Sequence, residues 1–142
     1  MDRDAIKKII PHREPMLLID EVELADGIAI GRYTVRGNEF FLQGHFPGNP
    51  VVPGVILCEM MAQSACILLD EQGGTFTPYF TGMKNVKFKN KVLPGDMIVF
   101  KSEKTARKGA FYFMKSNGYV NEKLCVCGEL SFAVTAKESR KE

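Results

Sequence analysis

The segment from Pro53 to Glu71 constrains the fold more than any other part of the chain, because it indicates a helix without a polar face. Proline costs no hydrogen bond in the first turn of a helix, and the pair Gly73-Gly74 provides a stop. The apolar side chains of the segment are Val55, Ile56, Leu57, Met60, Met61, Ala62, Ala65, Cys66, Ile67, Leu68 and Leu69. A helix that is apolar nearly all round is buried on several sides. The rest of the chain is therefore expected to surround it.

Most of the remaining chain carries the alternation and the turn residues of β-strands. A short helix is expected over Arg3–Ile10, before the irregular segment Pro11–Pro15. Strands are expected at Met16–Glu23, Ile28–Val35, Tyr79–Phe88, Met97–Lys108, Ala110–Asn117 and Lys123–Thr135. The expected turns are Asp26-Gly27, Pro94-Gly95-Asp96, Lys108-Gly109 and Asn117-Gly118. These elements predict one α+β domain over residues 1–142, with an antiparallel sheet curled around a long buried central helix.

Composition excludes several classes of protein. The formal net charge is only +2 over 142 residues, which does not favour a nucleic-acid binder. No run of 18 apolar residues occurs, and the N-terminus lacks the apolar stretch of a secretory signal, so a cytoplasmic protein without a membrane span is expected. The cysteines, Cys58, Cys66, Cys125 and Cys127, form no CxxC pair; a zinc site built on Cys125, Cys127 and a histidine, or a disulfide framework, is the less favoured interpretation.

The segment GHFPGNPVVPG, residues 44–54, differs from the rest of the chain in its high content of glycine and proline. Its three glycines and three prolines exclude both a helix and a regular strand. A long loop with a fixed shape is typical of functional segments. His45 lies in this loop, where a neutral imidazole could accept a proton near neutral pH.

Glu59 is the single acid within the apolar stretch Val55–Leu69 of the helix, and Gln63 lies one turn later on the same face. Desolvation favours the protonated form of a carboxyl group, which is the form that a general acid needs. Gly54 lies at the helix start, where free N–H groups and the helix dipole could bind an oxyanion. These residues indicate general acid and base chemistry beside an oxyanion hole. Read one at a time, Glu59 could be a structural residue bonded to Gln63, and Gly54 a plain helix-start glycine.

Three segments carry a resemblance to a known family. GHFPGNPVVPGVILCEMMAQSA (Gly44–Ala65) resembles the signature of the beta-hydroxyacyl-(acyl carrier protein) dehydratases of the FabZ type. IPHREPMLLIDEV (Ile10–Val22) and GMKNVKFKNKVLPGD (Gly82–Asp96) resemble the family's opening segment and its strand after the helix. The FabA-type relatives carry an aspartate where Glu59 stands, which favours the FabZ type.

The resemblance implies a hot-dog fold and a hydro-lyase that converts 3-hydroxyacyl-(acyl carrier protein) to the trans-2-enoyl product in the fatty acid elongation cycle, without cofactor or metal. It implies homodimers, gathered as a trimer of dimers, with active sites at the dimer interface. His45 would be the general base and Glu59, from the partner subunit, the general acid. Gly54 would polarise the thioester carbonyl, Gln63 would support the acid, and Tyr79 would gate the acyl tunnel.

Lysines near the third strand predict a docking site for the acidic acyl carrier protein. Lys87, Lys89 and Lys91 alternate, so on a strand they would share one face, with Lys84 nearby. The same lysines could equally guard a solvated strand edge.

Three other functions stay open at this point. A bifunctional dehydratase/isomerase making cis-3-enoyl products would use the same His45 and Glu59. An acyl-thioester hydrolase would share the fold but lack the loop of residues 45–50. A non-enzymatic acyl-binding regulator would not need both His45 and Glu59.

Overall fold

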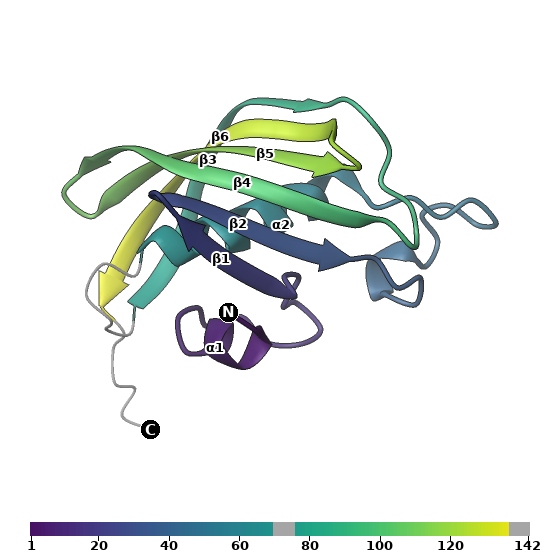
Figure 1. Cartoon of the computed structure of the whole chain (residues 1–142), viewed down its shortest axis with the longest axis horizontal. Coiled ribbons are helices and arrows are strands. Elements are labelled where there is room, and N and C mark those ends of the chain that lie inside the picture. Colours follow the sequence, from purple (N-terminus) through teal and green to yellow (C-terminus); the bar gives the residue numbers. More distant parts are fainter. Residues whose placement is uncertain (70–75, 137–142) are drawn as a thin grey trace.

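A computed structural model describes residues 1–69 and 76–136 of the chain. Six antiparallel strands form one sheet in the order β1-β2-β4-β5-β6-β3. Their bounds are β1 Glu21–Ala25, β2 Ile28–Thr34, β3 Phe76–Phe88, β4 Met97–Lys108, β5 Phe111–Val120 and β6 Lys123–Ala136. The sheet curls over the central helix α2 (Gly54–Cys66), and the short helix α1 (Arg3–Lys7) lies near β1, as Figure 1 shows. This arrangement is the hot-dog fold, and it confirms the predicted α+β class.

Helix α2 is buried from Leu57 onward apart from Glu59, as its apolar composition predicts. Its first turn is an exception, because Val55 is 74% exposed. The helix comes very close to β2 at Gly31, where an added Cβ would lie 2.8 Å from the Ser64 Cβ. A glycine in this strand therefore sets how deeply α2 sits in the sheet.

The α-helix is shorter than predicted. It ends at Cys66 and continues as a 3₁₀ turn over Ile67–Leu69, whereas the predicted end at Glu71 and the glycine stop lie outside the described residues. A second 3₁₀ turn, Phe40–Leu42, precedes the loop of His45.

The first strand also differs, because it begins at Glu21 and not at Met16. Leu17, Leu18 and Ile19 are all buried, so they lack the alternation of a sheet strand. The Leu18 N–H donates to the Gln63 side chain at 2.7 Å instead of pairing with a strand.

The turn predicted at Asn117-Gly118 is wrong, because both residues lie inside β5. Gly118 is required by packing: an added Cβ would lie 2.9 Å from the Phe100 ring and 2.8 Å from Val126. The hairpin turns at Asn121 and Glu122 instead, both of which have positive φ. The predicted turns at Asp26-Gly27 and Gly109 are confirmed, with positive φ at all three residues.

Among the described strands, β3 forms one edge of the sheet and pairs only with β6. From Tyr79 to Phe88 its residues are exposed, apart from the half-buried Val86. Its exposed apolar side chains are Tyr79 (56%), Phe80 (39%), Met83 (51%) and Phe88 (55%). A long apolar edge of this kind offers free backbone groups and side chains to another chain.

No helix among residues 1–69 and 76–136 is long and apolar enough to cross a membrane.

Candidate active site

His45 is held by its own loop. Its Nδ1 lies 3.0 Å from the Val51 carbonyl, and its backbone carbonyl accepts from the Val51 N–H at 2.9 Å. The imidazole also stacks on the Phe46 ring, with centroids 4.2 Å apart. A carbonyl can only accept, so Nδ1 carries a proton, and in the neutral ring Nε2 is therefore the basic nitrogen. The backbone of the proline-containing loop therefore selects the tautomer that can take up a proton.

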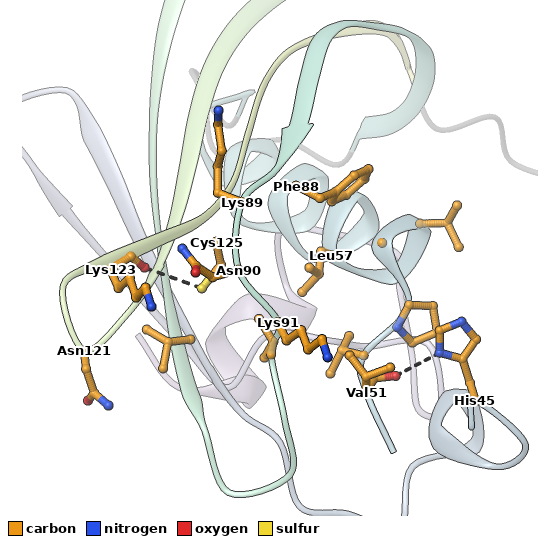
Figure 2. Close-up of a pocket in the computed structure, with 16 residues that line it drawn as sticks. His45, Val51, Leu57, Phe88, Lys89, Asn90, Lys91, Asn121, Lys123 and Cys125 are labelled. Atoms are coloured by element: carbon orange, nitrogen blue, oxygen red, sulfur yellow. Dashed lines mark hydrogen bonds between the residues drawn. The ribbon is translucent and has the colours of Figure 1, made fainter. Parts of the chain in front are cut away.

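The imidazole lies at the wall of an open cleft of about 1100 Å³. The cleft is lined by His45, Val51, Val52, Pro53, Gly54, Val55, Leu57, Phe88, Lys89, Asn90, Lys91, Val92, Val120, Asn121, Lys123 and Cys125. Figure 2 shows His45 at one end of this cleft and Asn121 and Lys123 at the other. A mostly apolar wall with a few polar groups suits a long apolar ligand that has a polar end.

Gly54 opens α2 in the same cleft. The helix has no side-chain N-cap, and the N–H groups of Ile56 and Leu57 both donate to Pro53. Within the described part of the chain, nothing accepts from the N–H of Gly54. The Phe88 ring covers this residue so closely that an added Cβ would lie 2.9 Å from it. Glycine here thus lets an aromatic ring lie against a helix start that still has a free donor.

Glu59 lies on the next turns of α2 and is not fully desolvated, since its side chain is 27% exposed. Its Oε2 accepts from Gln63 Nε2 at 2.8 Å, which places the predicted pair together. Gln63 is itself fixed from both ends: its Oε1 accepts from the Leu18 N–H at 2.7 Å, and its Nε2 also donates to the Met16 carbonyl at 2.7 Å. The amide therefore ties the carboxylate of α2 to the segment before β1.

His12 is a neighbour of Glu59 that the sequence analysis missed. Its Nε2 lies 3.5 Å from Glu59 Oε2. The signal that could have found it is the pair Pro11 and Pro15, which confine a second histidine much as the loop prolines confine His45.

The structure brings some of the predicted residues together and keeps others apart. His45 and Gly54 share the cleft, and Glu59 and Gln63 are bonded. Glu59 is not among the described residues that line the cleft of His45. Tyr79 is 56% exposed on β3 and does not line that cleft either. Within a single chain, the expected acid is therefore not part of the cleft wall that contains the expected base.

The prediction that Lys87, Lys89 and Lys91 share one strand face is wrong. Strand β3 ends at Phe88, and its register shifts between Lys84 and Lys87. Lys89 and Lys91 lie beyond the strand and line the cleft together with Lys123, which the sequence analysis also missed. Lys84 and Lys87 stay exposed on β3.

The thiols near the site are not prepared for chemistry. Burial raises the pKa of Cys58 and of Cys125, and burial followed by the negative charge of Glu59 raises the pKa of Cys66. Thiols held neutral in this way are poor nucleophiles. Among the described residues, no three His, Cys, Asp or Glu side chains are grouped as metal ligands.

Comparison with solved structures identifies the fold. The dehydratase heterocomplex ApeI:P from Xenorhabdus doucetiae superposes with a TM-score of 0.80 at 19% identity, over 93% of this chain and 91% of that one. A hypothetical thioesterase with coenzyme A from Streptococcus pneumoniae gives a TM-score of 0.63 at 15% identity, over 84% and 88%. At these identities the likeness concerns the fold alone.

Sequence relatives are much closer. The 3-hydroxyacyl-[acyl-carrier-protein] dehydratase FabZ of Clostridium perfringens is 40% identical over 94% of this chain and 99% of its own length. The proteins of the same name from Caldicellulosiruptor bescii and Moorella thermoacetica are 44% and 42% identical, over 92% and 96% of this chain and 96% and 99% of theirs. These matches confirm the resemblance drawn from the loop and helix of residues 44–65.

A family model described as the FabA-like domain matches residues 10–129, which include both histidines, the cleft and the central helix. The chain belongs to the FabA-like domain family.

Proposed function

We propose that this protein is a hydro-lyase that converts 3-hydroxyacyl-(acyl carrier protein) to trans-2-enoyl-(acyl carrier protein) in the elongation cycle of fatty acid synthesis. Its near-full-length relatives carry the name of this activity. The observation that carries the proposal to this chain is the free Nε2 of His45 beside the uncapped start of α2, in a cleft with an apolar wall.

His45 is the base in this proposal. Its Nε2 removes the C2 proton beside the thioester, and charge develops on the carbonyl oxygen. The Gly54 N–H and the positive end of α2 stabilise that charge. Because Nδ1 stays bonded to the Val51 carbonyl, the ring keeps its orientation when it becomes an imidazolium.

Glu59 of the partner subunit is the acid. The electron pair of the C2–H bond forms the C2=C3 double bond, the C3–O bond breaks, and the departing hydroxyl takes the Glu59 proton and leaves as water. His45 ends protonated and Glu59 ionised, and proton transfer through solvent restores both. No oxidant, reductant or metal is needed for this balance.

The exposed edge of β3 supports a homodimer. No strand of the described part of the chain pairs with its outer side, and Tyr79, Phe80 and Met83 are large apolar side chains left exposed on it. Pairing two β3 edges would join two curled sheets and bring two helices together. A trimer of such dimers and a tunnel gate at Tyr79 belong to the same proposal and rest on the resemblance, as does the location in the cytoplasm.

The dimer has a sharp test by subunit mixing. His45→Ala and Glu59→Gln protomers are each expected to be inactive, but a mixed dimer would contain one intact site. After unfolding and refolding together in equal amounts, activity should return to about a quarter of the wild-type value, because half of the dimers are mixed and have one good site of two. Absence of any recovery, with mixed dimers shown by mass, would contradict a site shared between subunits.

The acidic carrier would dock on the lysines at and beside the cleft. Lys89, Lys91 and Lys123 line it, and Lys84 and Lys87 extend the positive charge along β3. Reversal of the three cleft lysines to glutamate should raise KM for the carrier-linked substrate and abolish its salt dependence, with kcat on a small thioester unchanged. If wild type and the triple variant had equal KM values for the carrier-linked substrate at low salt, the docking proposal would be refuted.

The function itself is tested with purified protein and 3-hydroxydecanoyl-(acyl carrier protein). Loss of one water, with a trans-2 double bond in the product, is the expected result. A cis-3 product would make the protein a dehydratase/isomerase, and release of free carrier thiol would make it a thioester hydrolase. Recovery of unchanged substrate at high protein concentration would refute the proposed activity.

A further inference from the structure

We propose that His12 is a positioning residue that, together with Gln63, occupies one oxygen of Glu59 and leaves the other to carry the transferred proton. This inference rests on the proposed function, since it explains how the carboxyl group of the general acid in that reaction is oriented.

The backbone around His12 is held in place by hydrogen bonds. The Arg13 guanidinium donates to the carbonyls of Ile10, His12 and Lys7, which closes the backbone around the histidine. Farther along, the Gln63 side chain bonds to Met16 and Leu18. The segment is thus fixed on both sides of His12, and the ring is presented to Glu59 from a rigid backbone.

The two nitrogens of the His12 ring have different surroundings: one faces Glu59 and the other faces no partner among the described residues. Nε2 lies 3.5 Å from Glu59 Oε2, and Nδ1 is buried with no hydrogen-bond partner in the described structure. A buried N–H without an acceptor is more costly than a bare ring nitrogen that has merely lost its contact with water. Of the two neutral tautomers, the favoured one therefore carries its proton on Nε2, directed at the carboxyl of Glu59.

The 3.5 Å distance is at the outer limit of a hydrogen bond. Contacts between catalytic groups are often long before substrate binds and shorten in the complex. The side chains of His12 and Glu59 are 24% and 27% exposed, so the pair lies at the protein surface of this protomer, where a bound substrate would exclude water from it.

Both donors converge on the same carboxyl oxygen. Gln63 Nε2 donates to Oε2 at 2.8 Å, and His12 Nε2 points at Oε2 as well. Among the described contacts none engages Oε1. A proton on Oε2 would compete with two donors, so the neutral acid holds its proton on Oε1. After transfer, the same two donors stabilise the carboxylate that remains.

A purely structural role for His12 makes a different prediction, and two substitutions separate the two. His12→Gln can keep an N–H donor near the position of Nε2, whereas His12→Asn is polar but too short to reach Glu59. Circular dichroism and the melting temperature of each variant provide the control for folding.

The kinetic experiment compares two leaving groups at C3. Loss of hydroxide requires a proton, but chloride leaves with its electron pair and needs none. With the 3-hydroxybutyryl thioester, His12→Asn is expected to lower kcat about tenfold with little change in KM, and His12→Gln is expected to restore most of it. With the 3-chlorobutyryl thioester, all three proteins should eliminate chloride at similar rates. An equal loss with both substrates would show that His12 only supports the fold, and would overturn the proposal.

A second measurement does not depend on turnover. The chain has only two histidines, so a long-range ¹H–¹⁵N NMR spectrum of the imidazole rings can be assigned with the His12→Asn variant. We expect the neutral His12 ring to be the Nε2–H tautomer, with signals that shift in Glu59→Gln. A neutral ring with its proton on Nδ1, or no response to Glu59→Gln, would overturn the proposal. If wild-type protein failed to turn over either thioester, the proposed function would fail while this spectrum still decided the pairing.

Discussion

In the proposed mechanism, the two histidine segments of this protein use the same residue for opposite purposes. His45 lies in the loop before α2 and His12 in the segment before β1, and prolines confine both backbones. The neighbours differ: Nδ1 of His45 faces the Val51 carbonyl, whereas Nε2 of His12 faces the Glu59 carboxyl. The first contact leaves Nε2 free to accept a proton, and the second occupies Nε2 as a donor. The acceptor beside each ring, and not the residue type, therefore decides which histidine can act as a base.

The largest effect should come from removing either end of the proton path. His45→Ala and Glu59→Gln are each expected to lower kcat by at least about a hundredfold, since a general base or acid contributes 10²–10⁴-fold. The effect of His12→Asn on kcat should be much smaller, because in the proposed mechanism His12 only positions the acid and does not transfer a proton. Steady-state kinetics with unchanged melting temperatures would check this, and comparable losses for the two histidines would break the comparison.

A smaller loss is expected where the helix start meets the Phe88 ring. Gly54→Ala keeps the N–H donor but places a Cβ 2.9 Å from the ring, so either the ring or the helix start must shift. We expect kcat to fall by roughly tenfold or more, because small displacements of a catalytic donor are costly. Adding Phe88→Ala should recover part of the loss. No recovery would show that the glycine serves the helix start in another way.

Gln63→Leu tests the fixed carboxyl. The substitution removes a donor from Glu59 and leaves the buried Leu18 N–H and the Met16 carbonyl without their partner. A buried unsatisfied group costs about 1–3 kcal/mol, so the Leu18 N–H should produce a loss of that order in urea unfolding, and kcat should fall severalfold. Gln63→Glu offers the matched control, since it keeps the shape and places a second acid beside Glu59. Unchanged stability in Gln63→Leu would mean that the segment before β1 is not fixed by this amide.

The smallest effect concerns the ion pairs that attach the His12 segment to α1. Lys7 lies 2.9 Å from Glu14, and its hydrogen bond is the main cause that lowers the pKa of Glu14 from 4.5 to about 2. A carboxyl with a lowered pKa stabilises the fold above its unfolded pKa, and this contribution disappears as the pH falls from about 4.5 to about 2. Wild type should therefore melt slightly above Glu14→Gln at pH 7 and together with it near pH 2. Since the carboxyl is exposed, solvent screening keeps the difference small.

Much of the fold could be predicted because apolar pattern and turn chemistry act locally. The all-apolar stretch of α2 predicted a buried helix, and β4 was predicted with its observed bounds. The errors occur where distant packing decides. The pair Asn117-Gly118 is typical of a turn, but Gly118 lies in a strand, where it is needed for close packing against the distant residues Phe100 and Val126. The segment before β1 has the apolar composition of a strand, but its backbone bonds to the Gln63 side chain and not to another strand.

The site divides in the same way. Glu59 and Gln63 are one helical turn apart, so their contact follows from spacing. His12 and Glu59 are far apart in sequence, and only the folded chain brings them together. The prediction that Lys87, Lys89 and Lys91 share one face is wrong because the alternation of a strand does not continue past Phe88, where the chain leaves the sheet.

The open edge of β3 has a consequence for how the protein behaves when it is scarce. If the edge is satisfied only by a second copy, association follows mass action, and the free energy of folding of each protomer includes a term that depends on its own concentration. Diluted protein would lose specific activity before it loses secondary structure. Newly made chains would also be at risk until they meet, because the same apolar border accepts any extended segment as readily as the correct one.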